Sequence, residues 1–570
     1  MATPLPAPSF AELFTPKLVT ILKERYGAAD FRADLIAGLT VAIVALPLSM
    51  AIAIASGVTP DRGLYTAVIG GFVVSVLGGS RFQVGGPAGA FIVLVAAAAD
   101  KYGVDGLALA TIMAGFILLA IGFLRLGTFI KYIPYPVTVG FTAGIAVIIF
   151  ASQIKDLLGL TLAGKEPGPI VDKLAALAPA LVTANPAAVA LTVLVIGLIV
   201  VLRRLRPHWP GLLIAVTLAA LLATLLHLPV ETIGSRFGGI PQTLPAPHLP
   251  PFSIAKAVEL LPTALSFALL GCIESLLSAV VADAMTGRRH RSNCELVAQG
   301  AANIASALFG GICVTGAIAR TATNIRAGAR GPLAGILHAV FLLLFMAVAA
   351  PLARYIPLAA LAGVLATVAW NMAEKHAFAT LLRASRGDAV VLLATFLLTV
   401  FRDLTEGILV GFGIGVLLFV HRMAQAIEVE NPLLMAEGDR ADSVDRSRYD
   451  AATATDPDIV VYRISGAFFF GATASVAAAL DRIGQQAKAY IIDFSAVPIV
   501  DSTAAAMLEG FVQRMNRRGA QIFLTGARPA VRRVLLPQGL KPPRVRYAAT
   551  VEAAWAAARK EMGPLQRSAA

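Results

Sequence analysis

The sequence predicts a polytopic α-helical membrane protein with fourteen spans, followed by a small cytoplasmic α/β domain. Of its 570 residues, 57% are hydrophobic and 14% are charged, whereas soluble domains carry about 25% charged residues. Apolar segments that can cross about 30 Å of hydrocarbon recur from residue 35 to residue 425. Strand-like and helix-like segments then alternate, which is typical of an α/β domain. This composition excludes a single soluble globule and a disordered chain.

The membrane part divides into two halves of seven spans each. Because seven is odd, two copies of one unit would lie in the membrane in opposite orientations, as an inverted repeat. The predicted spans are 35–56, 64–78, 86–99, 106–124, 134–152, 187–202, 211–228, 259–283, 293–309, 316–327, 331–351, 356–372, 388–401 and 405–421. The expected domains are an N-terminal segment (1–34), a transmembrane domain (35–425, with repeats at about 35–228 and 259–425), a linker (426–455), the α/β domain (456–560) and a tail (561–570).

The distribution of Lys and Arg predicts that both termini are cytoplasmic. An even number of spans places the two ends on one side of the membrane. With the N-terminus inside, the inner segments carry 18 Lys and Arg residues and the outer segments carry 9, which satisfies the positive-inside rule. The net charge of +13 therefore lies in short connections between spans and does not indicate a nucleic-acid partner.

Two of the predicted spans are short and follow glycine-rich breaks. The third span follows the segment from Leu77 to Ala90, and the tenth follows the segment from Phe309 to Ala319. Each break is a Gly-Gly pair, a few extended residues and a half-helix, in corresponding positions of the two halves. Matched interruptions of this kind indicate the binding site of a transporter. The alternative is that the glycines only allow close packing of helices.

The two half-helices predict an anion-binding site near the middle of the membrane. Their N-termini would face each other, and each would bring unpaired N–H groups and about half a positive charge. Arg320 would add a full positive charge about one turn into the second half-helix; its alternative role is a structural partner for a buried carboxylate. The predicted substrate-binding residues are Ser49, Pro87, Ala88, Gly89, Ala90, Gly316, Ala317, Ile318 and Arg320. Pro87 is expected within the first helical turn, where no donor is lost.

Glu274 is a carboxylate ten residues inside the apolar eighth span. Such a group must be paired, protonated or exposed to a cavity, and a protonatable carboxylate beside the anion site suits proton coupling. Ser278 lies one turn further on the same helix face, and we predict that both residues take part in coupling. The alternative is a static ion pair between Glu274 and Arg320.

No motif in the sequence indicates an enzyme, a metal site or a cofactor. The three cysteines, Cys272, Cys294 and Cys313, do not have the spacing of a zinc site or a disulfide framework. The histidines at positions 208, 227, 290, 338 and 421 show no ligand spacing and are interpreted as structural or interfacial. A Walker loop and a nucleophile elbow are both missing from the sequence.

The soluble tail shows strands at Ile459, Ala489 and Gln521 and an amphipathic stretch that begins at Asp501. Ser502 at the start of this helix is predicted to be its N-cap. A regulatory role for Asp501 and Ser502, by phosphorylation or by docking of a cytosolic protein, is the alternative.

These residues together resemble the sulfate permease family, also called solute-carrier family 26, over essentially the whole chain. The family signature is seen in Pro60-Asp-Arg-Gly-Leu-Tyr-Thr-Ala67 and Gly78-Gly-Ser-Arg81, with Arg62 where an aromatic residue is common. The tail resembles a STAS domain, with Asp501-Ser-Thr before a helix. The resemblance implies core and gate subdomains, a homodimer in the bacterial inner membrane and anion transport by an elevator-like motion.

Within the family, the segments 271–287, 316–321 and 369–372 are similar to the enterobacterial C4-dicarboxylate transporter. Cyanobacterial sodium–bicarbonate members have Asp in place of Glu274 and Thr in place of Ser278 and Ile318, so H⁺ is the expected coupling ion and Na⁺ the alternative. Ala88 stands where Thr is frequent, which leaves backbone contacts to the anion. The expected substrate is C4-dicarboxylate first, sulfate second and bicarbonate third. An anion channel, a membrane sensor that signals through the tail and a nucleobase carrier are the alternatives.

Overall fold

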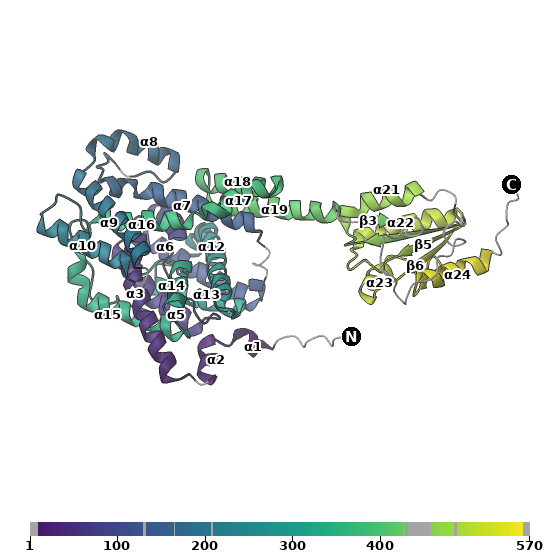
Figure 1. Cartoon of the computed structure of the whole chain (residues 1–570), viewed down its shortest axis with the longest axis horizontal. Coiled ribbons are helices and arrows are strands. Elements are labelled where there is room, and N and C mark those ends of the chain that lie inside the picture. Colours follow the sequence, from purple (N-terminus) through teal and green to yellow (C-terminus); the bar gives the residue numbers. More distant parts are fainter. Residues whose placement is uncertain are drawn as a thin grey trace. The chain divides into compact units, whose positions relative to one another are not determined.

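The computed structural model describes residues 9–24, 26–128, 133–164, 166–206, 209–425, 428–430, 458–483 and 487–562. The chain forms two compact units, Met1–Gly413 and Ile414–Ala570. The first is helical and the second contains a sheet (Figure 1). Most of the predicted linker, His208 and the residues beyond 562 lie outside the described residues.

Each of the fourteen predicted spans coincides with a helix or part of one. The first half contains α3 (Ala28–Ala55), α4 (Pro60–Tyr65) continued by a π-helical turn (Thr66–Gly70) and α5 (Gly71–Leu77), a 3₁₀ turn (Gly89–Phe91) leading into α6 (Ile92–Phe123), α7 (Tyr135–Leu158), α9 (Pro186–Leu205) and α10 (Gly211–Leu225). The second half contains α12 (Ile254–Thr286), α13 (Ser292–Leu308), α14 (Ile318–Arg326), α15 (Leu333–Ala353), α16 (Leu358–Met372), α18 (Arg386–Phe401) and α19 (Leu404–Gln425).

The membrane unit has features that the hydropathy pattern did not predict. The third and fourth spans are joined in α6, which is non-helical only at Gly103 (φ 71°, ψ −178°). Three further helices lie between spans: α8 (Ile170–Ala180), α11 (Ile233–Phe237) and α17 (Lys375–Ala384). Among the described residues, seven helices have at least 18 residues and are apolar enough to cross a membrane. Several other spans are shorter helices, such as α10 and α16 with 15 residues each and α14 with nine.

The spans pack into two groups of helices. One group contains α3 to α6 and α12 to α15, where α13 and α12 pack on α6 and α15 packs on α3. The other contains α7, α9, α10, α16 and α18, where α16 and α18 pack on α7. Helices α3 and α16 meet between the groups. Both groups take helices from both halves of the sequence, as the core and gate subdomains of an inverted repeat do.

The N-terminal segment is bound to the first helix group. It contains α1 (Phe10–Phe14) and α2 (Lys17–Lys23). The amide of Lys17 donates to the carbonyl of Gly78 at 2.9 Å, and Arg291 donates to the carbonyl of Thr15 at 2.7 Å. Arg81 forms an ion pair with Glu24 at 2.7 Å and lowers the pKa of that carboxyl group by a hydrogen bond. These contacts anchor residues before the first span to the loop that leads into the third span and to the start of α13.

The C-terminal unit is a five-stranded sheet with helices. The strands are β3 (Glu428–Glu430), β4 (Ile459–Ser465), β5 (Ala489–Asp493), β6 (Gln521–Thr525) and β7 (Arg546–Ala548), in the order β3-β4-β5-β6-β7. Only β3 is antiparallel to its neighbour. The helices are α21 (Thr473–Ile483), α22 (Ser502–Arg517), α23 (Pro529–Leu535) and α24 (Val551–Met562). The sheet therefore includes residues 428–430, which the sequence predicts to be part of the linker.

Candidate anion-binding site

The two glycine-rich breaks pair with each other as a short antiparallel sheet inside the helical unit. Strand β1 (Gly85–Gly86) lies beside β2 (Thr315–Gly316), with Gly85 opposite Gly316 and Gly86 opposite Thr315. The amide of Ala317 extends the pairing by donating to the carbonyl of Val84 at 3.1 Å. The sequence predicted both breaks but not this pairing, which fixes the starts of the two half-helices relative to each other.

Each half-helix begins within three residues of the end of its strand. The N-caps are Ala88 before the 3₁₀ turn that leads into α6, and Ala317 before α14. Within the described part of the chain, no hydrogen-bond acceptor is recorded for the amides of the first two helical residues at either start. Pro87 precedes the N-cap and does not lie in the first turn, so that prediction was wrong. The free amides and the helix dipoles make this a positive site.

Polar side chains of two neighbouring helices hold the extended residues before β2. The Asn303 side chain donates to the carbonyl of Val314 and accepts from its amide, both at 2.9 Å. Ser306 donates to the carbonyl of Ile312 at 2.8 Å, and Thr66 accepts from the amide of Ile312 at 2.7 Å. Non-helical backbone at this depth requires such partners because lipid supplies none. The extended segment is therefore held in place by hydrogen bonds to the neighbouring helices.

Helix α12 fixes the second half-helix through two serine residues. Ser275 accepts from the amide of Gly316 at 3.2 Å and bonds the Thr315 hydroxyl at 2.8 Å. Ser278 donates to the hydroxyl of Thr321 in α14 at 3.1 Å. Ser278 thus contacts the second half-helix, close to the site where we predicted it to act. Arg62, the departure from the family signature, donates to the Gly310 carbonyl at 2.8 Å.

Arg320 is a buried cation that joins the two half-helices. Its side chain is 1% exposed and donates to Ser49 Oγ at 3.0 Å, the Pro87 carbonyl at 3.3 Å and the Gly85 carbonyl at 3.4 Å. A guanidinium has five N–H groups, so two remain for a ligand, and Nε has no partner. Throughout the described ranges, no carboxylate lies within ion-pair distance of Arg320. Its alternative role as the partner of a buried carboxylate is not seen.

Glu274 lies in α12, one residue before Ser275, and its residue is 5% exposed. No hydrogen bond or ion pair to its carboxylate is recorded among the residues that the structure describes, so the alternative static pair with Arg320 is absent. A buried carboxylate without a partner is costly when charged and acceptable when neutral. This position suits a group that gains and loses a proton.

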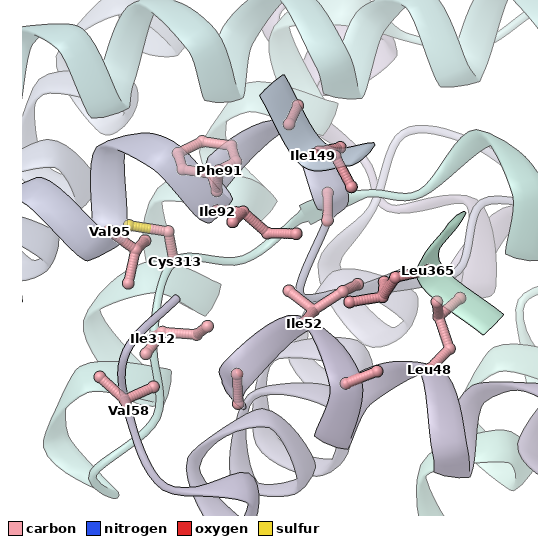
Figure 2. Close-up of a cluster of buried hydrophobic side chains, with 14 of the residues drawn as sticks. Leu48, Ile52, Val58, Phe91, Ile92, Val95, Ile149, Ile312, Cys313 and Leu365 are labelled. Carbon is pink, nitrogen blue, oxygen red and sulfur yellow. The ribbon is translucent and has the colours of Figure 1, made fainter. Parts of the chain in front are cut away.

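Apolar side chains separate the site from the second helix group. Figure 2 shows Leu48 and Ile52 of α3 near Leu365 of α16, and Ile149 of α7 near the first half-helix, where Phe91 and Ile92 lie. All six belong to one buried cluster. The hydrogen bonds described above for the site are all made within the first helix group. The contacts between the site and α7 and α16 of the second group are made by apolar side chains.

Other buried polar groups near the strand pair were missed by the sequence analysis. Both amide atoms of Gln83, the Asn324 carbonyl oxygen and both ring nitrogens of His338 have no partner within the described residues. A single Gln or His in an apolar sequence carries no spacing signal. The glycines beside them could have given one, because Gly316 and Gly71 are where these side chains come close to the backbone.

The regulatory residues predicted in the tail lie at the start of α22. Asp501 is the N-cap: its carboxylate accepts from the amide of Ala504 at 2.8 Å and from the amide of Phe470 at 2.9 Å. Ser502 is the first helical residue, so its assignment as N-cap was wrong. The carboxylate binds the two amides with a different oxygen each, Oδ1 for Ala504 and Oδ2 for Phe470.

Comparison with known proteins agrees with this architecture. The sulfate permease family model matches residues 31–395, and the STAS domain model matches residues 450–554. The putative sulfate transporter YvdB of Bacillus subtilis is 40% identical, over 90% of this chain and 95% of that protein. The transmembrane domain of a cyanobacterial bicarbonate transporter, BicA, is 34% identical with a TM-score of 0.61, over 67% of this chain and 98% of that one. Murine Slc26a9 shares the fold with a TM-score of 0.82 and 19% identity, over 98% and 96% of the two chains. The chain therefore belongs to the sulfate permease family of transporters and carries a C-terminal STAS domain, as the sequence resemblance predicted.

Proposed function

We propose that this protein is a secondary active transporter that takes up a small divalent anion together with protons. The observation that supports this most is Arg320, a buried cation without a carboxylate partner that lies between two helix starts with free amides. Burying a charge without a counter-charge is expensive. An anion that enters this site removes that cost, so the site favours negatively charged ligands of small size.

C4-dicarboxylate and sulfate are the substrates that we place first, and bicarbonate is the alternative. Two negative charges match one guanidinium and two half-helix dipoles better than one charge does. YvdB carries the name of a putative sulfate transporter and BicA that of a bicarbonate transporter. The similarity of segments 271–287 and 369–372 to the C4-dicarboxylate branch supports the dicarboxylate.

An elevator-like motion fits the distribution of contacts. The polar contacts of the anion site come from α3, α12, α13, α14 and the two strands, all in the first helix group. The second group meets the site through apolar side chains such as Leu365. Apolar surfaces slide without breaking hydrogen bonds, so the first group could carry the anion past α7 and α16 as one body.

Glu274 is the proposed proton carrier. Ile318, where a sodium site would need another hydroxyl, offers no oxygen, and Glu274 has no fixed partner that would hold it charged. In the proposed cycle the carboxylate takes up a proton with the anion on the outer side and releases it to the cytoplasm. The chain would then lie in the bacterial inner membrane as a homodimer with both termini cytoplasmic, and the STAS domain would be free to dock a cytosolic partner.

Uptake into proteoliposomes tests the proposal. Labelled succinate, sulfate and bicarbonate are offered with and without an acid-outside pH gradient, and with and without a sodium gradient. We expect accumulation of a divalent anion that needs the proton gradient. Sodium-driven uptake that ignores pH would contradict proton coupling, and channel-like flux that never exceeds equilibrium would contradict active transport.

The Glu274→Gln variant tests the carrier. It should lose accumulation driven by the gradient while retaining exchange of labelled for unlabelled anion. The matched control is Glu259→Gln, because Glu259 is an exposed residue of the same helix. Gradient-driven accumulation that persists in Glu274→Gln would exclude this residue as the carrier.

A further inference from the structure

His338 is a fully buried histidine whose ring has no hydrogen-bond partner. It lies in α15, whose sequence from Leu333 to Ala353 contains no other titratable side chain, and its residue is 0% exposed. Neither Nδ1 nor Nε2 has a partner in the described part of the chain. A neutral imidazole has one N–H donor and one acceptor, so both are unsatisfied. A buried polar group in this state requires an explanation.

The His338 ring lies close to β1, the strand that precedes the first half-helix. A Cβ atom on Gly71 would be 3.7 Å from His338 Cε1 and 2.9 Å from the Gly85 carbonyl oxygen, so the ring and this carbonyl meet at Gly71. The same carbonyl accepts from Arg320 Nη1 at 3.4 Å. His338 and Arg320 therefore both approach the carbonyl of Gly85.

Arg320 is the charged side chain that lies nearest to His338 among those on the helices packed around it. Helix α3 faces it with Gly38, and its acidic residue four positions earlier, Asp34, already accepts from the amides of Arg330 and Gly331 and the hydroxyl of Tyr26. Helix α5 contributes Gly71 at the ring and Ser75 one turn on, which is bonded to the Gly71 carbonyl. Across the described residues, no carboxylate is recorded in contact with the ring.

Water has polar partners along this side of α15. A Cβ atom on Gly335, one turn before His338, would lie 3.6 Å from the carbonyl oxygen of Gln83. The Ser75 hydroxyl oxygen also comes close to Gly335, and the ring nitrogens of His338 have no partner in the described ranges. A buried water molecule binds between two or more such polar groups, and the proton for the ring would come from water held in this way.

We propose that His338 is a second proton-binding group whose protonation is linked to occupancy of the anion site. The inference rests on the proposed proton-coupled transport. With the site empty, an imidazolium would lie beside the uncompensated charge of Arg320, which opposes protonation. A bound anion compensates that charge, and the imidazole nitrogen takes a proton from water to become imidazolium. Linkage is reciprocal, so protonated His338 strengthens anion binding by the same factor.

The proposal adds a second proton to the cycle. Glu274 and His338 would together take up two protons with one divalent anion and release them when the anion leaves. The charge of the loaded site then equals that of the empty site, so the loaded body would cross the low-dielectric membrane without carrying additional charge.

Proton uptake on anion binding tests the proposal directly. Sulfate or succinate is added to the purified full-length protein in weak buffer, and the protons taken up per anion bound are measured with a pH indicator. If two protons bind with the anion, the dissociation constant should rise about a hundredfold per pH unit over the range where both groups titrate, and about tenfold in either single variant. The variants are His338→Gln and Glu274→Gln, with His376→Gln, at an exposed residue of α17, as the matched control.

The outcomes separate the two proposals. His338→Gln should bind anion and lose one proton per anion, whereas Glu274→Gln should lose the other. Unchanged proton uptake in His338→Gln would overturn the role of His338 and leave that of Glu274 intact. Anion binding to the unmodified protein without proton uptake would overturn both.

A measurement on the unmodified sequence guards against a variant that fails to fold. Protein labelled with ¹⁵N at histidine is reconstituted, and its imidazole signals are recorded at constant pH before and after sulfate is added. One ring should change from the neutral to the imidazolium form, also in the His376→Gln protein. A spectrum without such a change would overturn the proposal.

Discussion

Gly86→Ala should displace the Arg320 guanidinium from the anion site. A Cβ atom on Gly86 would overlap Nη1 and lie 2.9 Å from Cζ, whereas real Cβ contacts are seldom closer than 3.4 Å. The strand pair fixes the backbone of Gly86 opposite Thr315, so the guanidinium moves rather than the strand. The added methyl group carries no charge and the arginine itself is kept, so the variant moves the cation without removing it; the φ of 157° at Gly86 adds some backbone strain for a residue with a side chain.

The size of the effect follows from the contacts of Arg320. A displaced guanidinium loses its bonds to the carbonyls of Gly85 and Pro87 at 3.4 and 3.3 Å, and it no longer points its free N–H groups at the ligand. Hydrogen bonds to a charged group contribute about 1.5–3 kcal/mol each. Loss of one such bond to the anion corresponds to a decrease in affinity of about tenfold to a hundredfold.

Calorimetric titration of the purified protein with sulfate and succinate measures this change. One control variant places the same methyl group elsewhere. Gly197→Ala adds it in α9, where no atom lies within 4 Å of the new Cβ. Gly197→Ala should bind normally. Normal affinity in a folded Gly86→Ala protein would refute the role assigned to Arg320.

Three further substitutions test how the site and the tail are held. Glu295→Ala removes an acceptor of the buried Gly79 amide at 2.8 Å and should lower the free energy of unfolding by about 2–4 kcal/mol, seen as a lower Tm in detergent; an unchanged Tm would contradict it. Asn303→Leu leaves both backbone groups of Val314 without their partner. It should abolish anion binding and lower the Tm by less than Glu295→Ala does, whereas retained binding would show that the extended segment keeps its conformation without Asn303. Asp501→Ala removes the N-cap of α22 and should cost about 1–2 kcal/mol, read as faster hydrogen exchange in the first turn of that helix; unchanged exchange would argue against the cap.

The spans could be predicted from sequence because hydrocarbon imposes one strong constraint. A helix that crosses the membrane must be apolar for most of its length, so hydropathy located all fourteen segments. The helices between spans, such as α8 and α17, were missed because an amphipathic helix on the surface of a membrane protein gives a weaker pattern. Strand β3 was missed because it has only three residues, Glu428–Glu430, which form an edge strand by pairing with β4, and the alternation of Glu-Val-Glu is too short to indicate a strand.

The candidate site was predictable in its backbone and less so in its side chains. Glycines that interrupt an apolar run in both halves indicated the two half-helices, and a lone arginine after the second break indicated the charge. The partners of that arginine depend on how two segments more than 200 residues apart pair with each other, which no local pattern encodes. For the same reason Asn303 looked like an ordinary polar residue, and His338 was interpreted as structural. Each acquires a role only when the fold places it against a broken segment.

The two half-helices share a backbone design but differ at one position that decides their chemistry. Both follow a two-residue strand and an alanine N-cap, and the third helical residue is Phe91 in the first and Arg320 in the second. Phe91 packs edge-on against Phe267 at 6.0 Å, in the apolar cluster. Arg320 reaches across to the carbonyl of Pro87, just ahead of the other helix. The cation of one repeat therefore organises the entry to the other, so neither repeat alone forms the positive site. An exact repeat would place either two unpaired cations or none in the middle of the membrane. A single cation that reaches from one repeat to the start of the other repeat's half-helix is the asymmetry on which the proposed anion site depends.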